Sequence, residues 1–309
     1  MTQTAIEFRS VVKRYGDATA VAGIDLSIAK GELVTFLGPS GCGKTTSLRL
    51  IAGLELPSAG QVFIAGRDVS RDPASARNVG MVFQSYALFP HISVLENVAY
   101  GPVIRGTPKA EAQARAREIL EQVGLAGLEA RLPAELSGGQ QQRVAVARAI
   151  VQQPDVILFD EPLSNVDAKL RRKVREEIRS LQRRFGLTAV YVTHDQEEAL
   201  AVSDRIVVMD RGRIAQVGTP SDLYEHPASP FIADFIGDAN LIRGTVAQGQ
   251  FTAPGMALPV TGPDGPATLS IRPERITLAP DVELHVRRPL SRTDRRLVEA
   301  ILDLAHHRK

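Results

Sequence analysis

A glycine-rich stretch near the start of the chain constrains the fold more than any other feature. Residues 38–45 read Gly-Pro-Ser-Gly-Cys-Gly-Lys-Thr, which fits the pattern G-x-x-x-x-G-K-[ST]. Because glycine has no Cβ, such a loop can wrap closely around an anion and point several backbone N–H groups at it. Lys44 would then place a positive charge beside nucleotide phosphates, and the Thr45 hydroxyl could hold Mg²⁺. The predicted phosphate contacts are Gly38, Pro39, Ser40, Gly41, Cys42, Gly43, Lys44, Thr45 and Thr46.

The segments on either side support this interpretation. Residues 33–37 are all apolar except Thr35 and predict a buried strand, and residues 45–52 predict a helix closed by Gly53. The N-terminus of that helix would face the phosphates, where the helix dipole favours negative charge. The alternative is a glycine-rich turn between a strand and a helix that binds nothing.

Composition excludes several classes of protein. The chain has 309 residues, of which 44% are hydrophobic and 23% charged, as in ordinary globular proteins. A formal net charge of +2 is too small to indicate a nucleic-acid partner. The single cysteine, Cys42, excludes an intrachain disulfide. Residues 1–10 lack the apolar core of a signal peptide, and the apolar run 144–151 is short and interrupted by Arg148. Any role at a membrane is therefore expected to come through a partner.

Short β-rich runs alternate with helical patterns over about the first 235 residues, which predicts an α/β fold with a mostly parallel sheet. The predicted strands are residues 6–12, 31–37, 61–64, 79–83, 156–159 and 188–192.

Three further helices are predicted in the same part of the chain. One begins with Thr107 as its N-cap and Pro108 as its first residue, and runs to about Val123. A charged helix spans residues 165–184, with a solvated basic face, and a third follows from Gln196. The basic face is predicted to comprise Lys169, Arg171, Arg172, Lys173 and Arg175, and nucleic-acid binding by these residues is the alternative.

The composition changes at about Gly237. We predict an α/β domain over residues 1–237, with a helical subdomain at about 85–150, and a β-rich extension over residues 238–309 that ends in a helix from Ser291. That last helix is expected to be packed, with a membrane-surface helix as the alternative.

Two acidic residues are candidates for the Mg²⁺ ligand and the general base of the nucleotide site. Asp160 and Glu161 directly follow the apolar run 156–159. An aspartate at the end of a buried strand can order Mg²⁺ and its waters, and Glu161 could accept a proton from an attacking water. Alone, this pattern is weak, because strands often end in acidic residues.

Three further segments resemble ligand-binding ends of secondary structure. Residues 136–143 form a second glycine–serine turn that opens a helix, which Ser137 can cap, and its free N–H groups form another anion site. His194 ends the strand 188–192 on the side where parallel sheets bind ligands, and Gln84 follows the strand 79–83 in the same way.

Taken together, these segments resemble the nucleotide-binding subunits of ATP-binding cassette (ABC) transporters, over roughly residues 5–240. Residues 38–45 match the Walker A loop, Gln84 the Q-loop glutamine, and Ser137, Gly138, Gly139 and Gln140 the family signature. Asp160 and Glu161 match Walker B and its catalytic glutamate, residues 164–167 match the D-loop, and His194 matches the switch histidine. Tyr15 falls where the family stacks an aromatic ring on adenine.

The resemblance implies a fold and a mechanism. The fold is a P-loop cassette with a mostly parallel core sheet, an antiparallel β part and a helical subdomain. Two copies of the chain close head to tail, so that each ATP lies between Walker A of one copy and the signature of the other. Glu161 is then the general base, His194 contacts the γ-phosphate, and Asp167 communicates across the dimer. Thr45, Gln84 and Asp160 serve Mg²⁺.

The resemblance also implies partners and a place in the cell. The segments 86–91, 96–101 and 194–199 resemble the importer branch with C-terminal extensions, and Ile271–Glu274 resembles part of that extension. Residues 226–229 and 237–240 look most like ferric-ion importers; polyamine, sugar, glycerol phosphate and phosphonate importers are the alternatives. The implied partners are two membrane permease subunits or domains at the cytoplasmic face of the inner membrane and, indirectly, an extracytoplasmic substrate-binding protein.

We expect the permeases to bind the surface around residues 84–100, through the apolar residues Tyr86, Leu88, Phe89 and Ile92. The alternative is a buried loop with aromatic residues that face the core. A soluble ATPase that acts on nucleic acid or ribosomes is the second class considered. The single cassette and the lack of a long heptad tract disfavour it, and no nucleic acid is expected as a partner.

Overall fold

The computed structural model describes residues 3–163 and 168–272, with the backbone alone for residues 168–170. The chain divides into two compact units, one ending at Pro220 and the other beginning at Ser221. No helix in the described ranges is both long and apolar enough to cross a membrane. The predicted boundary at residue 237 rests on composition and stays a prediction.

A six-stranded sheet forms the centre of the first unit, in the order β10-β9-β3-β8-β7-β6. All neighbouring strands are parallel except β10, which runs antiparallel to β9. Runs of consecutive apolar residues give β3, β7 and β8 almost wholly buried side chains, as expected of central parallel strands. The bounds are β3 Leu33–Leu37, β6 Val79–Val82, β7 Val156–Asp160, β8 Ala189–Val192, β9 Arg205–Asp210 and β10 Arg213–Gly218.

Three strand predictions were too long: β3 begins at Leu33 instead of residue 31, β8 begins at Ala189 instead of residue 188, and β6 ends at Val82 instead of residue 83. Phe83 is 37% exposed instead of buried in the sheet.

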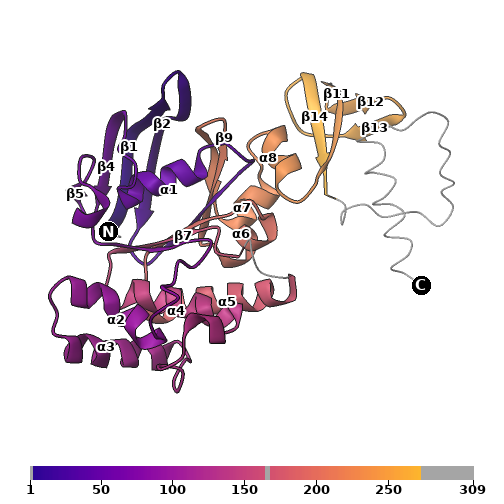
Figure 1. The fold of residues 1–309 in the computed structure, drawn as a ribbon. Helices are drawn as coiled ribbons and strands as arrows, with labels where there is room; N and C mark the ends of the chain where they lie inside the picture. Colours follow the sequence, from indigo (N-terminus) through magenta and orange to yellow (C-terminus); the bar gives the residue numbers. More distant parts are fainter. Residues whose placement is uncertain (1–2, 164–167, 273–309) are drawn as a thin grey trace, which may run out of the picture. The chain divides into compact units, whose positions relative to one another are not determined.

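Successive residues of the central strands point into two different cores. In β7, Ile157 and Phe159 belong to one apolar cluster, whereas Val156 and Leu158 belong to the other. The first cluster lies against α2 (Val94–Ile104), α3 (Lys109–Gln122), α4 (Gly138–Ile150) and α5 (Ala168–Phe185). The second lies against α1 (Lys44–Ala52) and an antiparallel sheet (Figure 1). The central sheet is therefore covered on both faces, which excludes water from its interior.

The antiparallel sheet has the order β2-β1-β4-β5, with bounds β1 Thr4–Tyr15, β2 Ala18–Ala29, β4 Ala59–Ile64 and β5 Arg67–Asp68. This sheet, the parallel central sheet and the helices of Figure 1 confirm the predicted α/β class with a parallel core and an antiparallel β part. Two short 3-10 helices, η1 Ala74–Ala76 and η2 Pro133–Glu135, connect elements of this unit.

The ends of the helices differ in detail from the prediction. Pro108 has φ −52° and ψ 136°, which are not helical, so it is the N-cap and α3 begins at Lys109. The prediction that Thr107 is the N-cap and Pro108 the first helical residue is therefore wrong. A Ser93–Glu96 capping box that the prediction did not include begins α2. The predicted third helix is α6 (Gln196–Val202).

The second unit begins with α7 (Pro220–Glu225) and α8 (Pro230–Phe235) and continues as an antiparallel sheet in the order β13-β12-β11-β14. Arg272, just after β14, is 9% exposed, and its guanidinium donates to the carbonyls of Tyr224, Ala233 and Ile236. These bonds tie α7 and α8 to the sheet. The strands are β11 Asn240–Ala247, β12 Gln250–Ala253, β13 Met256–Pro259 and β14 Gly265–Ile271. Glu274 and the predicted helix from Ser291 lie outside the described residues.

Candidate functional site

Four adjacent strands bring the predicted site together at one edge of the central sheet. In the order β3-β8-β7-β6, each strand runs in the same direction. The phosphate loop follows β3, His194 follows β8, Asp160 and Glu161 end β7, and Gln84 follows β6. The carboxyl ends of parallel strands form the edge where such sheets bind ligands. Residues far apart in the chain therefore meet at one site.

Glycine is required in the loop that follows β3. Gly38, Gly41 and Gly43 have φ values of 156°, 77° and 105°, which side-chain-bearing residues rarely adopt. A Cβ on Gly38 would also collide with the carbonyl oxygen of Met209 and with the Cys42 thiol. Gly43 caps α1 without a side-chain hydrogen bond, so no side chain competes for the first N–H groups of that helix. These groups can bind an anion.

Lys44 brings its charge into the loop. Its residue exposure is 6%, and its Nζ donates to the carbonyl oxygens of Gly38 at 2.7 Å and Pro39 at 2.9 Å. Pro39, Ser40 and Gly41 are exposed. The positive charge thus lies directly beneath the exposed rim of the loop, where phosphate oxygens would sit.

Cys42 belongs to the core beneath the loop. It is 3% exposed, and its Sγ lies 3.8 Å from the Nζ of Lys44. Burial raises the pKa of the Cys42 thiol, with Lys44 opposing this. The side chain therefore stays a neutral thiol that fills space.

Glu161 and His194 face each other across the ends of β7 and β8. The Oε2 atom of Glu161 lies 3.5 Å from Nδ1 of His194. Glu161 has φ 44°, an unfavourable left-handed conformation, and its N–H donates to the carbonyl of Val192 at 3.1 Å. The turn at the end of β7 thus directs the carboxylate of Glu161 toward the histidine.

The side chains assigned to Mg²⁺ supply hard oxygen donors, which suit this ion: a hydroxyl in Thr45, an amide in Gln84 and a carboxylate in Asp160. Burial raises the pKa of Asp160, to which the charge of Glu161 adds, while Arg49 opposes it. Among the described residues, no group of three or more His, Cys, Asp or Glu side chains could hold a metal. A hydroxyl, an amide and one carboxylate suit Mg²⁺, which is usually bound through one or two carboxylates plus waters and substrate phosphates.

Tyr15 lies at the end of β1, beside α1. Its residue exposure is 46%, and the Nζ of Lys13 lies 4.8 Å from its ring centroid. Desolvation of the hydroxyl raises the pKa of Tyr15, and hydrogen bonding to Glu55 adds to this, whereas Thr46 lowers it. The contact with Thr46 places the exposed ring next to the start of the phosphate-loop helix.

The predicted signature opens a different helix. Ser137 and Gln140 form a capping box: the Ser137 Oγ accepts from the Gln140 N–H at 3.4 Å, and the Gln140 Oε1 accepts from the Ser137 N–H at 2.9 Å. Ser137 and Gly138 are exposed, and Gly139 is buried. This helix, α4, packs against α2, α3 and β6, whereas α1 packs against β2, β4, β7 and β8. The two anion-binding helix starts thus have different surroundings. Asp167, the predicted D-loop residue, lies outside the described residues.

Arg148 is a site-related residue that the sequence interpretation missed. Its Nη2 donates to the carbonyl of Tyr86 at 2.9 Å and its Nη1 to that of Ala87 at 2.7 Å. Tyr86 and Ala87 have φ values of 59° and 48°, so the loop after Gln84 has an unfavourable backbone that Arg148 stabilises. A charged residue inside the otherwise apolar run 144–151 was the available signal.

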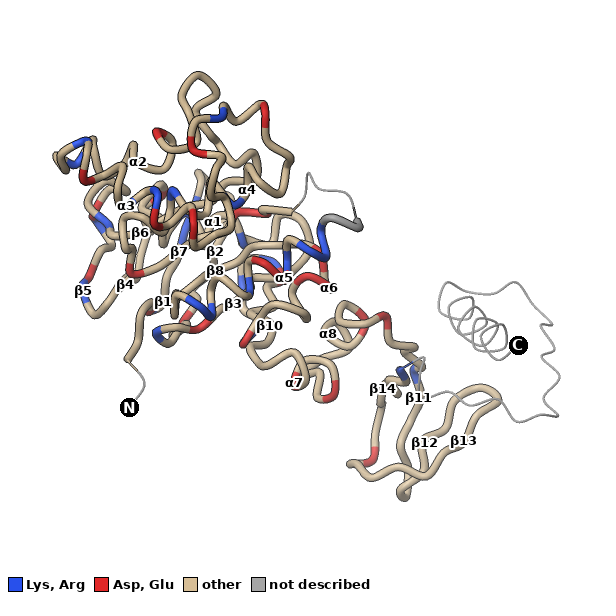
Figure 2. Tube along the Cα trace, turned by 90° about the horizontal axis from the view of Figure 1, so that it is seen from below, with Lys and Arg blue, Asp and Glu red and all other residues tan. Residues whose placement is uncertain are grey.

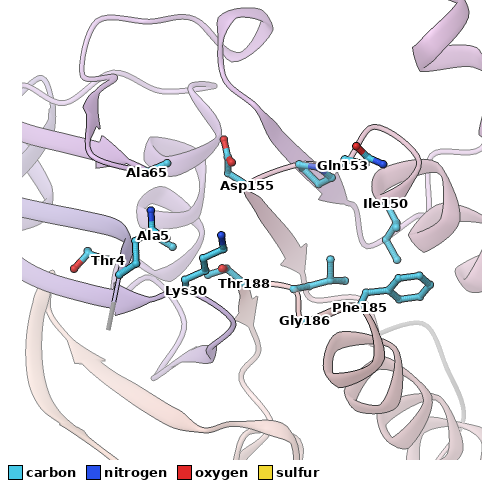
Figure 3. Close-up of a pocket in the computed structure, with 13 residues that line it drawn as sticks. Thr4, Ala5, Lys30, Ala65, Ile150, Gln153, Asp155, Phe185, Gly186 and Thr188 are labelled. Carbon is cyan, nitrogen blue, oxygen red and sulfur yellow. The ribbon is translucent and has the colours of Figure 1, made fainter. Parts of the chain in front are cut away.

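A cavity of about 340 Å³ lies at the other edge of the central sheet. Figure 3 shows Lys30, Asp155 and Thr188 among its lining residues, and each precedes a central strand. It therefore lies at the amino ends of the strands, away from the phosphate loop, and takes no part in the site.

This sheet edge and its phosphate loop define a nucleotide-binding cassette. A model of the family described as ABC transporter matches residues 21–164. The chain is 57% identical over 284 residues to the Fe(3+) ions import ATP-binding protein FbpC of Brucella abortus (strain 2308), covering 89% of this chain and 80% of the relative. The protein of the same name from Escherichia coli (strain K12) is 54% identical over 283 residues, covering 90% and 81%. The chain belongs to the ABC transporter family, as an ATP-binding subunit.

Solved structures agree with the fold. A dimeric structure of the ATP-binding cassette MJ0796, bound to ADP and Pi in a post-hydrolysis state, is 32% identical with a TM-score of 0.60, covering 70% of this chain and 98% of that one. The structure of cbiO1 from Clostridium perfringens, part of an ABC transporter complex, is 28% identical with a TM-score of 0.67, covering 72% and 92%.

Proposed function

We propose that this chain is the ATP-hydrolysing subunit of an importer for ferric ion, peripheral to the cytoplasmic face of the membrane. The observation that carries the proposal is the meeting of the phosphate loop, Glu161, His194 and Gln84 at the carboxyl ends of four adjacent strands. The names of the relatives from Brucella abortus and Escherichia coli support ferric ion as the substrate.

In the proposed reaction, Lys44 and the first N–H groups of α1 bind the phosphates of ATP, and Tyr15 stacks on the adenine. Thr45, Gln84 and Asp160 would hold Mg²⁺, which would neutralise charge on the phosphates. Glu161 accepts a proton from the attacking water, and His194, at 3.5 Å from Glu161, contacts the γ-phosphate. Catalysis then consists of positioning and charge stabilisation.

We further propose that two copies of the chain bind two ATP molecules head to tail. The signature helix α4 and the phosphate-loop helix α1 contact different elements, so a second copy would supply the signature over each ATP. Ser137 and Gly138 are exposed and available for such a contact. The dimeric ADP-bound relative supports this arrangement.

A groove of about 490 Å³ beside the loop after Gln84 is the proposed docking surface for an apolar helix of a membrane permease. Phe83, Phe89 and Tyr100 line it, and the rings of Phe89 and Tyr100 lie 4.6 Å apart. Phe83 and Tyr100 are 37% and 44% exposed. Of the residues expected to form this surface from the sequence, Tyr86 is buried at 8% and Leu88 packs against the core. The apolar surface is thus built largely from other residues.

Uptake of radioactive ferric iron tests the proposed function. A strain lacking the gene should regain uptake when it carries the wild-type chain but not when it carries Glu161→Gln. The Glu176→Gln variant is the matched control, because the Glu176 side chain is 68% exposed on α5. Normal iron uptake in the deletion strain, with loss of polyamine, sugar, glycerol phosphate or phosphonate uptake, would reassign the substrate.

A further inference from the structure

The loop that carries His194 is attached to a buried carboxylate. Glu198 of α6 is 4% exposed. Its Oε2 accepts hydrogen bonds from the Thr193 hydroxyl at 2.8 Å and the Tyr191 hydroxyl at 3.1 Å. The Thr193 hydroxyl in turn accepts from the N–H of Asp195 at 3.0 Å. The residues on both sides of His194 are therefore connected to Glu198.

Helix α5 contributes a cation to the same cluster. The Nη1 of Arg171 lies 3.2 Å from Oδ2 of Asp195, and its Nε lies 3.7 Å from Oε1 of Glu198. The other carboxylate oxygen of Asp195 accepts from the N–H of Glu198 at 3.0 Å and caps α6. One guanidinium thus faces two carboxylates that flank the histidine loop.

This finding corrects the prediction of a solvated basic face on α5, in which the side chain of Lys169 lies outside the described part of the chain. Figure 2 shows Lys and Arg along α5 and Asp and Glu around the start of α6. Arg172 and Lys173 are exposed, but Arg171 is half-buried, and Arg175 is half-buried and donates to the carbonyl of Glu197 at 3.1 Å. One side of the helix is therefore used to hold the segment that follows β8.

We propose that Glu198 and Arg171 are positioning residues that hold His194 in place against Glu161. The inference rests on the contact of His194 with the γ-phosphate under the proposed function. The His194 side chain is 60% exposed, so packing does little to fix its ring. Its place is set instead by the backbone at Thr193 and Asp195, and both residues are bonded within the cluster.

The cluster also connects the two sides of the reaction centre. Helix α5 begins at Ala168, soon after Glu161 in the chain, and carries Arg171. The ion pairs of Arg171 with Asp195 and Glu198 therefore join the start of α5 to the histidine loop.

Two variants of the full-length protein test the proposal. Glu198→Gln keeps the shape and an acceptor for Thr193 while removing the charge that faces Arg171, and Arg171→Gln removes the other charge. We expect kcat to fall about 10- to 100-fold with unchanged MgATP affinity, since a misplacement of about 1 Å can cost on the order of 100-fold. Arg171→Lys should restore part of kcat. Arg172→Gln is the matched control, because the Arg172 side chain is 78% exposed on the same helix.

The ring resonances of His194 provide a second readout. His194 is one of 6 histidines, and the NMR signal that is missing in His194→Ala identifies it. This signal should shift in Glu198→Gln and Arg171→Gln but not in Arg172→Gln. Wild-type kcat and an unshifted signal in both variants would overturn the proposal.

The His194→Ala background separates positioning from a structural role. Adding Glu198→Gln to His194→Ala should cause no further loss of hydrolysis. A full additional loss there, together with a lower melting temperature, would show a structural role and overturn the proposal. Normal hydrolysis by His194→Ala alone would instead remove His194 from the proposed mechanism. In that case, the shift of the His194 ring signal in Glu198→Gln and Arg171→Gln would decide whether these residues position the histidine.

Discussion

Nδ1 of His194 lies 3.5 Å from Oε2 of Glu161, although the two residues follow different strands and are far apart in the chain. The parallel pairing of β7 with β8, in which Asp160 lies opposite Val192, brings them together. A carboxylate and an imidazole at this separation can act on one water and one phosphate at the same time.

Replacing Glu161 by Gln should leave MgATP binding intact and lower kcat at least about 100-fold, because the shape is kept while the general base is lost. ATP hydrolysis and equilibrium titration of nucleotide measure the two effects. The variant should also accumulate as a dimer in ATP during size-exclusion chromatography. Near-normal turnover would remove Glu161 from the role of base.

Replacing Lys44 by Ala should weaken MgATP binding about 10- to 100-fold, the range given by losing one or two charge-assisted hydrogen bonds. Isothermal titration measures the dissociation constant. Lys30→Ala is the control, because Lys30 lines the cavity at the opposite edge of the sheet. Equal affinities for the two variants would show that the loop does not bind the phosphates.

Replacing Ser137 by Arg should block hydrolysis while each chain still binds ATP. The larger, positively charged side chain would prevent the signature of one copy from covering the ATP bound by the other copy. A mixture of Ser137→Arg and Lys44→Ala chains should recover at most one intact composite site per heterodimer. Steady-state ATPase titrations of the mixture measure this recovery. Full-rate hydrolysis by pure Ser137→Arg protein would contradict the head-to-tail dimer.

Replacing Phe89 or Tyr100 by Asp should abolish transport and co-purification with permeases while the isolated ATPase keeps most of its activity, because a charge in the groove disfavours an apolar helix. Two variants are used because a change at Phe89 also removes its contact with Arg148, whose guanidinium carbon lies 5.8 Å from the ring centroid. Tyr100 is 44% exposed, so its replacement disturbs the packing less. Leu258→Asp, in the second unit, is the control for an exposed leucine. Normal iron uptake with Tyr100→Asp would place docking elsewhere.

Stability should depend on pH through Glu198. Burial raises the pKa of Glu198 above its ordinary value of 4.5, Asp195 adds to this, and Thr193, Tyr191 and Arg171 oppose it. The folded protein thus holds this proton more tightly than the unfolded chain, so its contribution to stability is greatest below the unfolded pKa and is lost as pH rises through the folded pKa. As pH rises from 4.5 through the higher pKa of the folded state, the free energy of unfolding should decline more, or rise less, for the wild type than for Glu198→Gln. Identical pH profiles by urea denaturation would contradict the assigned burial.

The sequence predicted the components of the site because each is local. The glycines of residues 38–43 stand at the spacing that lets the loop wrap an anion, and the mostly apolar runs 156–159 and 188–192 are typical of central parallel strands. Family resemblance then supplied the antiparallel β part, which the strands β1, β2, β4 and β5 confirm. Element ends were predicted less well. Thr107 has the propensity of an N-cap and Phe83 that of a strand residue, but α3 is capped by Pro108 and β6 ends at Val82.

By itself, the sequence predicted which residues would bind phosphate and indicated which strands are buried, because both depend on neighbours a few positions away. Only the tertiary structure decided the order β3-β8-β7-β6, in which Thr35 lies opposite Tyr191. It also decided that Arg148 holds the carbonyls of Tyr86 and Ala87, and that Arg171 faces Asp195 and Glu198. These contacts join segments that the sequence separates widely. They exist because burial of both sheet faces forces polar groups near the core to find partners wherever the packed chain provides them.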